Sequence, residues 1–269
     1  MPNDISLPPP QAPRILAVAN QKGGVGKTTT AINLATALAA IDKKVLILDL
    51  DPQGNASTGL GVDRHARRVS SYDLLLSDAV VSQAVQATRI PNLHLVPSTV
   101  DLAGAELELV DIERREFRLK RALAASDVRF DYILIDCPPA LGLLTLNALT
   151  AAHAVLVPLQ CEFYALEGIS YLVRTVERVK RAFNPELEIQ GIVLTMFDKR
   201  NNLSELVARD VRSYFSDKVY DTVIPRNVRV SEAPSYGKPV LLYDFDCAGS
   251  QAYLHLASEV IKREKALLA

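Results

Sequence analysis

Short apolar runs alternate with longer segments along most of the chain, and the apolar residues of the longer segments recur at helical spacing. The runs have the length of strands buried on both faces, and the longer segments have the pattern of helices that bury one face. This alternation predicts an α/β fold, with a doubly wound, mainly parallel sheet flanked by helices. Strands are expected at residues 14–19, 45–48, 93–96, 132–135, 154–159, 189–197 and 219–224.

The helices between these runs follow from the same periodicity. Ser250 is expected to cap the last helix, because a serine side chain can accept a hydrogen bond from a free N–H group of the first turn. The mixed charges within 113–121 are interpreted as a solvated helix face, and 231–239 as a turn-rich segment. Helices are expected at residues 28–41, 103–112, 114–125, 165–183, 203–215 and 250–265, with short helices between 70 and 88.

The composition narrows the class of protein. The 269 residues are 49% hydrophobic and 23% charged, which is typical of a globular protein rather than a disordered or fibrous one. The formal net charge of −1 gives no global attraction to nucleic acid or to an anionic membrane, so any such attraction requires a local patch. Cys137, Cys161 and Cys247 form no CxxC pair and are interpreted as reduced core thiols.

The first thirteen residues are rich in proline and lack both a basic segment and an apolar segment of a signal peptide. They predict a flexible Pro-rich tail at residues 1–13, followed by a single domain at 14–269. No stretch reaches the roughly 18 apolar residues that a membrane span requires. A cytoplasmic location is therefore expected.

The run at 14–19 leads directly into the sequence NQKGGVGKTTT at residues 20–30, and a helical pattern follows. Glycines let a backbone approach an anion closely, and the N-terminus of the next helix adds a partial positive charge. The stretch therefore predicts a phosphate-binding loop. Lys27 is expected to reach the β- and γ-phosphates, and the Thr28 hydroxyl to bind Mg²⁺. The expected nucleotide contacts are Gly23, Gly24, Val25, Gly26, Lys27, Thr28 and Thr29.

One feature of this loop departs from the generic phosphate-binding pattern. The pattern requires a glycine at the position of Gln21, and an additional lysine, Lys22, follows it. Lys27 already suffices for the phosphates, so the second lysine indicates a further role.

Acidic residues follow two of the predicted strands. Asp49 and Asp51 come at the end of the strand at 45–48, and Asp136 ends the strand at 132–135. Ligands of open parallel sheets bind at the carboxyl ends of strands. Asp136 resembles the second nucleotide motif, in which a hydrophobic strand presents an aspartate to the Mg²⁺ shell.

These motifs, together with IPRNVRVSEAPSYG at residues 224–237, occur in the order found in ParA-type chromosome or plasmid partitioning ATPases. From about residue 14 to its end the chain resembles this family, which belongs to the deviant Walker A class of P-loop NTPases. The resemblance implies a Mg²⁺-dependent ATPase that hydrolyses ATP to ADP and phosphate and forms an ATP-sandwich homodimer. It also implies non-specific binding of double-stranded DNA by the dimer, a centromere-binding ParB-type partner, and a nucleoid-associated location.

The resemblance also assigns roles in hydrolysis. Lys22 matches the residue that contacts the nucleotide of the partner subunit, Asp51 the carboxylate that positions the attacking water, and Asp136 a Mg²⁺ contact through water. Asp49 either supports the metal shell or caps a loop. The catalytic residues expected on this basis are Lys22, Lys27 and Asp51, and the metal-binding residues are Thr28, Asp51 and Asp136.

Two further sites rest on the same resemblance. Met196 and Phe197 are expected near the adenine, although both also fit as core residues at a sheet edge. The other residues expected near the base are Asp198, Pro225, Arg226 and Asn227.

The expected DNA contacts are Lys199, Arg200 and Arg229. Between Lys199 and Lys238 eight basic residues stand against five acidic ones, which makes a modest local excess of positive charge. The alternative is that these charges are solvated and that one arginine faces the nucleotide.

Two other functions remain open. A membrane-associated positioning ATPase of MinD type requires a basic amphipathic C-terminus, whereas the apolar positions of 253–261 are interpreted as core-packing, so no stable membrane association is expected. An iron-sulfur reductase relative would require bridging cysteines, which Cys137 beside Asp136 does not supply.

Overall fold

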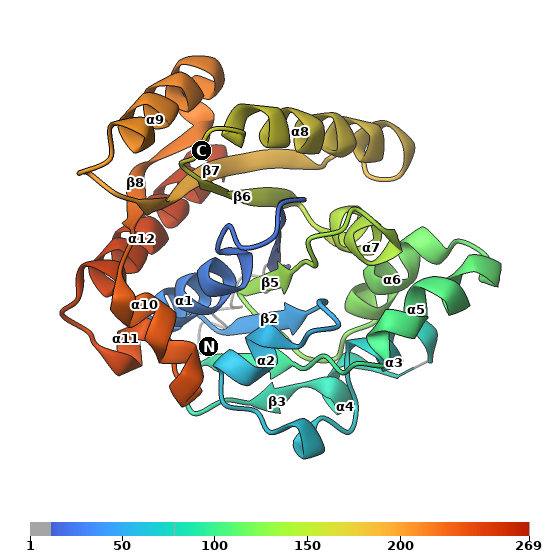
Figure 1. Cartoon of the computed structure of the whole chain (residues 1–269). Helices are drawn as coiled ribbons and strands as arrows, with labels where there is room; N and C mark the ends of the chain where they lie inside the picture. The colour runs from blue at the N-terminus through green and yellow to red at the C-terminus, as the bar shows by residue number, and fades with distance from the viewer. Residues whose placement is uncertain (1–11, 78, 269) are drawn as a thin grey trace, which may run out of the picture.

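The computed structural model describes residues 12–77 and 79–268 (Figure 1). Within these residues, the strands form one eight-stranded sheet in the order β3-β4-β2-β5-β1-β6-β7-β8. All neighbouring strands pair in parallel except β3 and β4, which are antiparallel. The strands are β1 Arg14–Val18, β2 Val45–Asp49, β3 Gln86–Ala87, β4 Leu93–Val96, β5 Tyr132–Asp136, β6 Ala154–Gln160, β7 Glu188–Phe197 and β8 Val219–Pro225.

Helices cover both faces of this sheet (Figure 1). The helices are α1 Lys27–Ala39, α2 Asn55–Gly59, α3 Ser71–Leu76, α4 Val81–Ala84, α5 Leu102–Glu108, α6 Arg118–Ala124, α7 Leu143–Ala151, α8 Ala165–Ala182, α9 Asn202–Phe215, α10 Val228–Glu232, α11 Val240–Tyr243 and α12 Ala248–Leu268. Short 3-10 turns lie at Arg64–Ala66, Leu109–Asp111, Arg115–Phe117, Ser216–Lys218 and Ala233–Tyr236. The predicted α/β fold with a mainly parallel sheet is confirmed.

Side-chain alternation along the central strand β1 separates two hydrophobic cores. Ile15 and Ala17 belong to the core beneath α5 to α9, and Leu16 and Val18 to the core beneath α1 and α12. Both faces of β1 are therefore buried, as its continuous apolar run predicted. The chain leaves β1 at the middle of the sheet and passes through the glycine-rich loop into α1.

The last helix belongs to the second of these cores. Tyr253, Leu256 and Val260 are buried in it, and they hold α12 against α1 and β8. The core-packing interpretation of the C-terminal apolar stripe is confirmed. In the described part of the chain, no helix combines the length and apolarity needed to cross a membrane. The predicted tail at 1–13 falls almost entirely outside the described residues.

Some local predictions were wrong. Helix α7 was not predicted, because its sequence LLTLNALTA is buried on most sides and has no polar face to produce a helical period. The segment expected to be turn-rich forms part of α10 and the turn at Ala233–Tyr236. Ser250 does not cap α12, which begins at Ala248; the Ser250 hydroxyl instead donates a hydrogen bond to the Asp244 carbonyl at 2.6 Å.

Candidate nucleotide-binding site

The glycine-rich loop between β1 and α1 is held in shape by side chains at its base. The Asn20 side chain donates to the Pro158 carbonyl at 2.8 Å and accepts from the Lys22 N–H at 3.0 Å. The Thr195 hydroxyl donates to the Val25 carbonyl at 2.8 Å, and the Val25 side chain is buried. Gly26, which precedes α1 as its N-cap, has a φ of 89°, in the left-handed region that favours glycine. These contacts hold the loop in a defined shape.

Lys27 lies across this loop from the first turn of α1. Its ammonium donates a hydrogen bond to the Lys22 carbonyl at 3.0 Å, and the side chain is buried. Burial lowers the pKa of Lys27, while Asp136 raises it in opposition. The nearby carboxylates favour the charged form of this desolvated ammonium, which is the form that binds a phosphate.

Asp136 ends β5, between β2 and β1. In the register of the sheet it lies beside Asp49 on β2 and Val18 on β1. It is fully buried, and among the described residues neither of its carboxylate oxygens has a hydrogen-bond partner. Burial, followed by the nearby Asp49, raises the pKa of Asp136 well above its usual range. The nearby Thr28 hydroxyl lowers the pKa of Asp136 in opposition, although the hydroxyl and the carboxylate do not have the geometry of a hydrogen bond.

Asp49 has different partners. It accepts hydrogen bonds from the Ser57 N–H at 2.8 Å, from the Ser57 hydroxyl at 2.6 Å and from the Asp51 N–H at 3.3 Å. Burial raises the pKa of Asp49 to about 6, against the opposing effect of Ser57. These contacts favour the second of the two roles left open for Asp49, because the carboxylate organises the loop from β2 to α2.

Asp51 begins that loop and is buried, with an exposed fraction of 7%. One of its carboxylate oxygens accepts a hydrogen bond from the Gln53 N–H at 2.9 Å, which fixes the orientation of the side chain. Asp51, Asp136 and Lys27 interact electrostatically with one another. The structure thus brings together residues that are far apart in sequence at the carboxyl ends of the central strands.

The residues at this end of the sheet fit Mg²⁺ bound mainly by phosphate oxygens and water. Within the described residues, no group of three or more His, Cys, Asp or Glu side chains could hold a metal ion by itself. Mg²⁺ in nucleotide sites is commonly bound by one or two protein oxygens together with phosphates and waters. The unpaired carboxylate of Asp136, with the Thr28 hydroxyl and Asp51 nearby, provides oxygens of this kind.

A cavity of about 500 Å³ adjoins the loop on the side of β7 and β8. Met196 lines it, with a backbone φ of 50° in the left-handed region, whereas Phe197 packs against the hydrophobic core. The core interpretation therefore holds for Phe197, and the place of Met196 near the adenine stays a prediction. Pro225, Arg226 and Asn227 also line the cavity, together with Gly26 and Thr29 of the phosphate-binding loop and α1.

The cationic residues predicted to contact DNA lie in two places. Lys199 and Arg200 belong to the exposed loop between β7 and α9, and Arg229 lies in α10. The Arg200 guanidinium is paired with both carboxylate oxygens of Asp198, at 3.0 and 2.9 Å, and its side chain is 88% exposed. These hydrogen bonds lower the pKa of Asp198 to about 2.

Lys22 lies on the outside of the loop, with 44% of its side chain exposed. Its ammonium forms an ion pair with Glu162, which follows β6. The two lysines of the loop therefore have different surroundings: Lys27 is buried, and Lys22 is partly exposed and paired with Glu162.

Arg67 was missed by the sequence analysis. It is buried and donates hydrogen bonds to the carbonyls of Ser98 at 3.1 Å and Val62 at 2.9 Å, which holds the loop after Asp51. A Cβ at Gly54, whose φ is 63°, would lie 2.5 Å from its guanidinium. No local pattern could reveal this role, because Arg67 occurs among other charged residues of a segment that resembles a solvated loop.

The phosphate-binding loop is followed by the buried Lys27, and Asp136 ends the neighbouring strand β5. This is the spatial order that phosphate binding requires, and it defines the chain as a P-loop nucleoside triphosphatase.

A family model described as an AAA domain matches residues 13–189. The chromosome partitioning protein ParA of Caulobacter vibrioides is 63% identical over 254 residues, which cover 94% of this chain and 95% of that protein. The chromosome-partitioning ATPase Soj of Treponema pallidum is 51% identical and covers 93% of this chain and 98% of its own length.

The chain belongs to the ParA/Soj family of chromosome partitioning ATPases and is an ATP hydrolase. Among solved structures, cobyrinic acid a,c-diamide synthase from Mycobacterium smegmatis is similar, with a TM-score of 0.83 and 41% identity over 94% of this chain and 96% of that chain. That protein was solved with a bound ATP analogue and magnesium.

Proposed function

We propose that this ATPase binds ATP with Mg²⁺, dimerises around the nucleotide, and binds double-stranded DNA without sequence preference as the dimer. Hydrolysis would return it to a monomer that releases DNA, in a cycle stimulated by a ParB-type partner on the nucleoid in the cytoplasm. Residues 14–269 would act as one domain, because α12 packs on one face of the same sheet that carries the phosphate-binding loop.

The observation that carries this proposal is the different placement of the two lysines in one phosphate-binding loop. Lys27 is buried beside Asp136 and serves the phosphates bound by its own chain. Lys22 is exposed on the outside of the loop, where it would contact a nucleotide held by a second copy. A cation supplied in trans stabilises the dimer only when phosphates are present, so ATP would favour dimerisation through mass action.

Sedimentation and DNA filter binding with ADP, ATP and a slowly hydrolysed ATP analogue test this function. The dimer and the DNA complex are expected with ATP and the analogue, and only monomer with ADP. DNA binding that is equally strong with ADP and ATP would contradict the proposed coupling.

The ion pair between Lys22 and Glu162 must open before Lys22 can contact a partner's nucleotide. Lys22→Ala is expected to weaken ATP-dependent dimerisation by about tenfold or more, the size of a charge-assisted hydrogen bond. Glu162→Gln is expected to strengthen dimerisation about twofold to tenfold. In each of the two subunits, Lys22 then no longer has to give up an exposed ion pair before it contacts the partner's nucleotide. Sedimentation equilibrium with the slowly hydrolysed analogue measures both effects, and a weaker dimer for Glu162→Gln would show that Glu162 itself supports the interface.

Arg200 is the better exposed of the two arginines predicted to contact DNA. Arg200→Ala is expected to lower the slope of log affinity against log salt by about two for a dimer, because each subunit then neutralises one DNA phosphate fewer. Asp198→Asn is expected to have the opposite effect on DNA affinity, because it removes the carboxylate that pairs with Arg200. Filter binding over a range of salt measures the DNA affinity of both variants. The ATP affinity of each variant is the control, because a change in ATP affinity would indicate that Asp198 contacts the nucleotide.

A further inference from the structure

The guanidinium of Arg67 is buried close to the aspartates at the end of β2, and hydrogen bonds occupy it fully. It donates five of them, as many as a guanidinium has N–H groups. The acceptors are all neutral oxygens: the carbonyls of Gly54, Val62 and Ser98, and the Thr58 hydroxyl. Because these bonds occupy its N–H groups, Arg67 can affect a reaction only through the groups that it holds.

The surroundings of Arg67 are unfavourable for a charged group. Burial lowers the pKa of Arg67, and the nearby Asp49 carboxylate raises it in opposition. Asp49 itself accepts hydrogen bonds from Ser57 and from the Asp51 N–H. Burying a charge that binds only neutral oxygens costs free energy, so this arrangement favours a fixed backbone geometry more than it favours stability.

Two of the oxygens held by Arg67 belong to the segment that begins with Asp51. The Gly54 N–H closes a turn by donating to the Asp51 carbonyl at 2.8 Å, and Arg67 contacts the Gly54 carbonyl at the end of this turn at 3.5 Å. The Thr58 hydroxyl donates to the same carbonyl at 3.0 Å and accepts from Arg67 at 2.9 Å. Arg67 and Thr58 together therefore hold the far end of the turn that carries Asp51.

The contact with Ser98 joins this segment to the sheet. Arg67 donates to the Ser98 carbonyl at 3.1 Å, two residues after the end of β4. The Ser98 N–H donates to the Ser57 hydroxyl at 3.0 Å, and that hydroxyl donates to Asp49 at 2.6 Å. The end of β4, the end of β2 and the start of α2 thus belong to one network of hydrogen bonds.

Helix α2, which this network holds, faces the phosphate-binding loop. A cavity of about 270 Å³ lies between α1 and α2, and Thr28, Thr29, Asn55 and Thr58 are among the residues that line it. Thr58 therefore belongs both to the contacts of Arg67 and to the wall opposite Thr28, the predicted ligand of Mg²⁺. A shift of α2 would change the position of Asp51 relative to the bound phosphates.

We propose that Arg67 is a positioning residue for ATP hydrolysis, which fixes Asp51 relative to the phosphates by holding the turn at Gly54 and the start of α2. This inference rests on the proposed function, because it takes Asp51 as the carboxylate that orients the attacking water. A misplacement of about 1 Å can slow a reaction about 100-fold. Arg67 therefore affects turnover more than it affects ATP binding.

The first test is the ATP turnover of Arg67→Lys and Thr58→Val, with Arg68→Lys at the exposed neighbouring position as the matched control. A lysine keeps the charge but lacks the planar fork that binds several oxygens at once. Arg67→Lys is expected to lower kcat about tenfold to 100-fold, and Thr58→Val about threefold to tenfold, with KM for ATP changed less than about twofold. The control is expected to retain both constants. A raised KM with unchanged kcat would assign Arg67 to ATP binding and overturn the inference.

A double-mutant cycle with Asp51→Ala distinguishes positioning of Asp51 from a general structural effect. If Arg67 acts through Asp51, Arg67→Lys is expected to change turnover by less than about twofold once Asp51 is replaced. Effects that multiply in the double variant would overturn the inference, as would full turnover by Arg67→Lys. Thr58→Val, which removes no charge, serves in the same cycle if Arg67→Lys does not fold. Full turnover by Asp51→Ala alone would instead contradict the role of Asp51 in the proposed function, and with it the inference.

Discussion

Asp51→Ala is expected to bind ATP almost as tightly as the unaltered protein and to hydrolyse it about 100-fold to 10,000-fold more slowly, the range of general acid–base catalysis. The side chain is buried at the carboxyl end of β2, and the Gln53 N–H orients its carboxylate. A fixed carboxylate in this place can accept a hydrogen bond from an attacking water and hold it in line. Phosphate release at saturating ATP and a separate measurement of ATP affinity check the two halves of this prediction.

The matched control for that variant is Asp217→Ala, an exposed aspartate in the turn after α9. It is expected to retain full turnover. If Asp51→Ala retains turnover while Asp49→Asn loses it, the roles of the two aspartates are reversed. That outcome would require Asp49 to exchange its hydrogen bonds with Ser57 for a contact with water.

Asp136→Asn is expected to make the nucleotide-free protein more stable and to remove most of the benefit that Mg²⁺ gives to ATP binding. The carboxylate is buried, and among the described residues it has no hydrogen-bond partner. An unpaired buried polar group costs about 1–3 kcal/mol, and a charged one costs more, so the neutral amide of asparagine is less unfavourable in this place than the carboxylate. Removing the charge should therefore raise Tm by roughly 2–10 °C for a protein of this size. The gain in stability and the loss of Mg²⁺ dependence together would identify Asp136 as a group held unpaired for a ligand.

The sign of the pH dependence follows from the raised pKa of Asp136. Between the usual pKa of an aspartate and this higher value, the folded chain binds more protons than the unfolded chain. Stability is therefore lost as the pH rises through this window, and the advantage of Asp136→Asn should grow from acidic to neutral pH. Thermal denaturation over pH 5 to 8, with and without EDTA and ATP, measures both effects. A variant with unchanged Tm and full Mg²⁺ dependence would exclude this role.

The central part of the fold could be predicted because each of its signals is local. The apolar runs of β1, β2 and β5 are buried on both faces, so the strands appear in the sequence as continuous hydrophobic segments. The glycine-rich loop appears between the first strand and a helix, as phosphate binding requires. Helix α7 was not predicted, because it is buried on most sides and its sequence has no polar positions at helical spacing. The same extensive burial made the strands easy to recognise as continuous apolar runs.

The cavity beside the loop could be predicted only in part. Resemblance placed Met196 and Phe197 near the base without deciding between the cavity and the core. The structure assigns one residue to each, since the left-handed backbone at Met196 interrupts the regular course of β7 near its end. Such a conformation is rare for a residue with a side chain, and no sequence pattern signals it.

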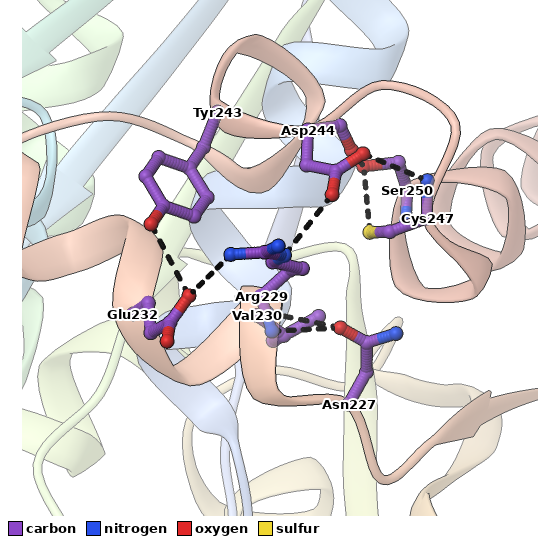
Figure 2. Close-up of polar contacts among 8 residues, drawn as sticks. All are labelled: Asn227, Arg229, Val230, Glu232, Tyr243, Asp244, Cys247 and Ser250. Carbon is purple, nitrogen blue, oxygen red and sulfur yellow. Dashed lines mark hydrogen bonds and ion pairs between the residues drawn. The ribbon is translucent and has the colours of Figure 1, made fainter.

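By itself, the sequence determined the fold class, the phosphate-binding loop and the aspartates at the strand ends, because these depend on hydrophobic periodicity and short motifs. Only the tertiary structure decided which charged side chains meet. Lys22 pairs with Glu162, Arg67 holds the loop after Asp51, and Arg229 pairs with Asp244 (Figure 2). The physical reason is that such an ion pair or buried hydrogen bond joins residues distant in sequence. The two groups come within bonding distance only after the sheet has assembled.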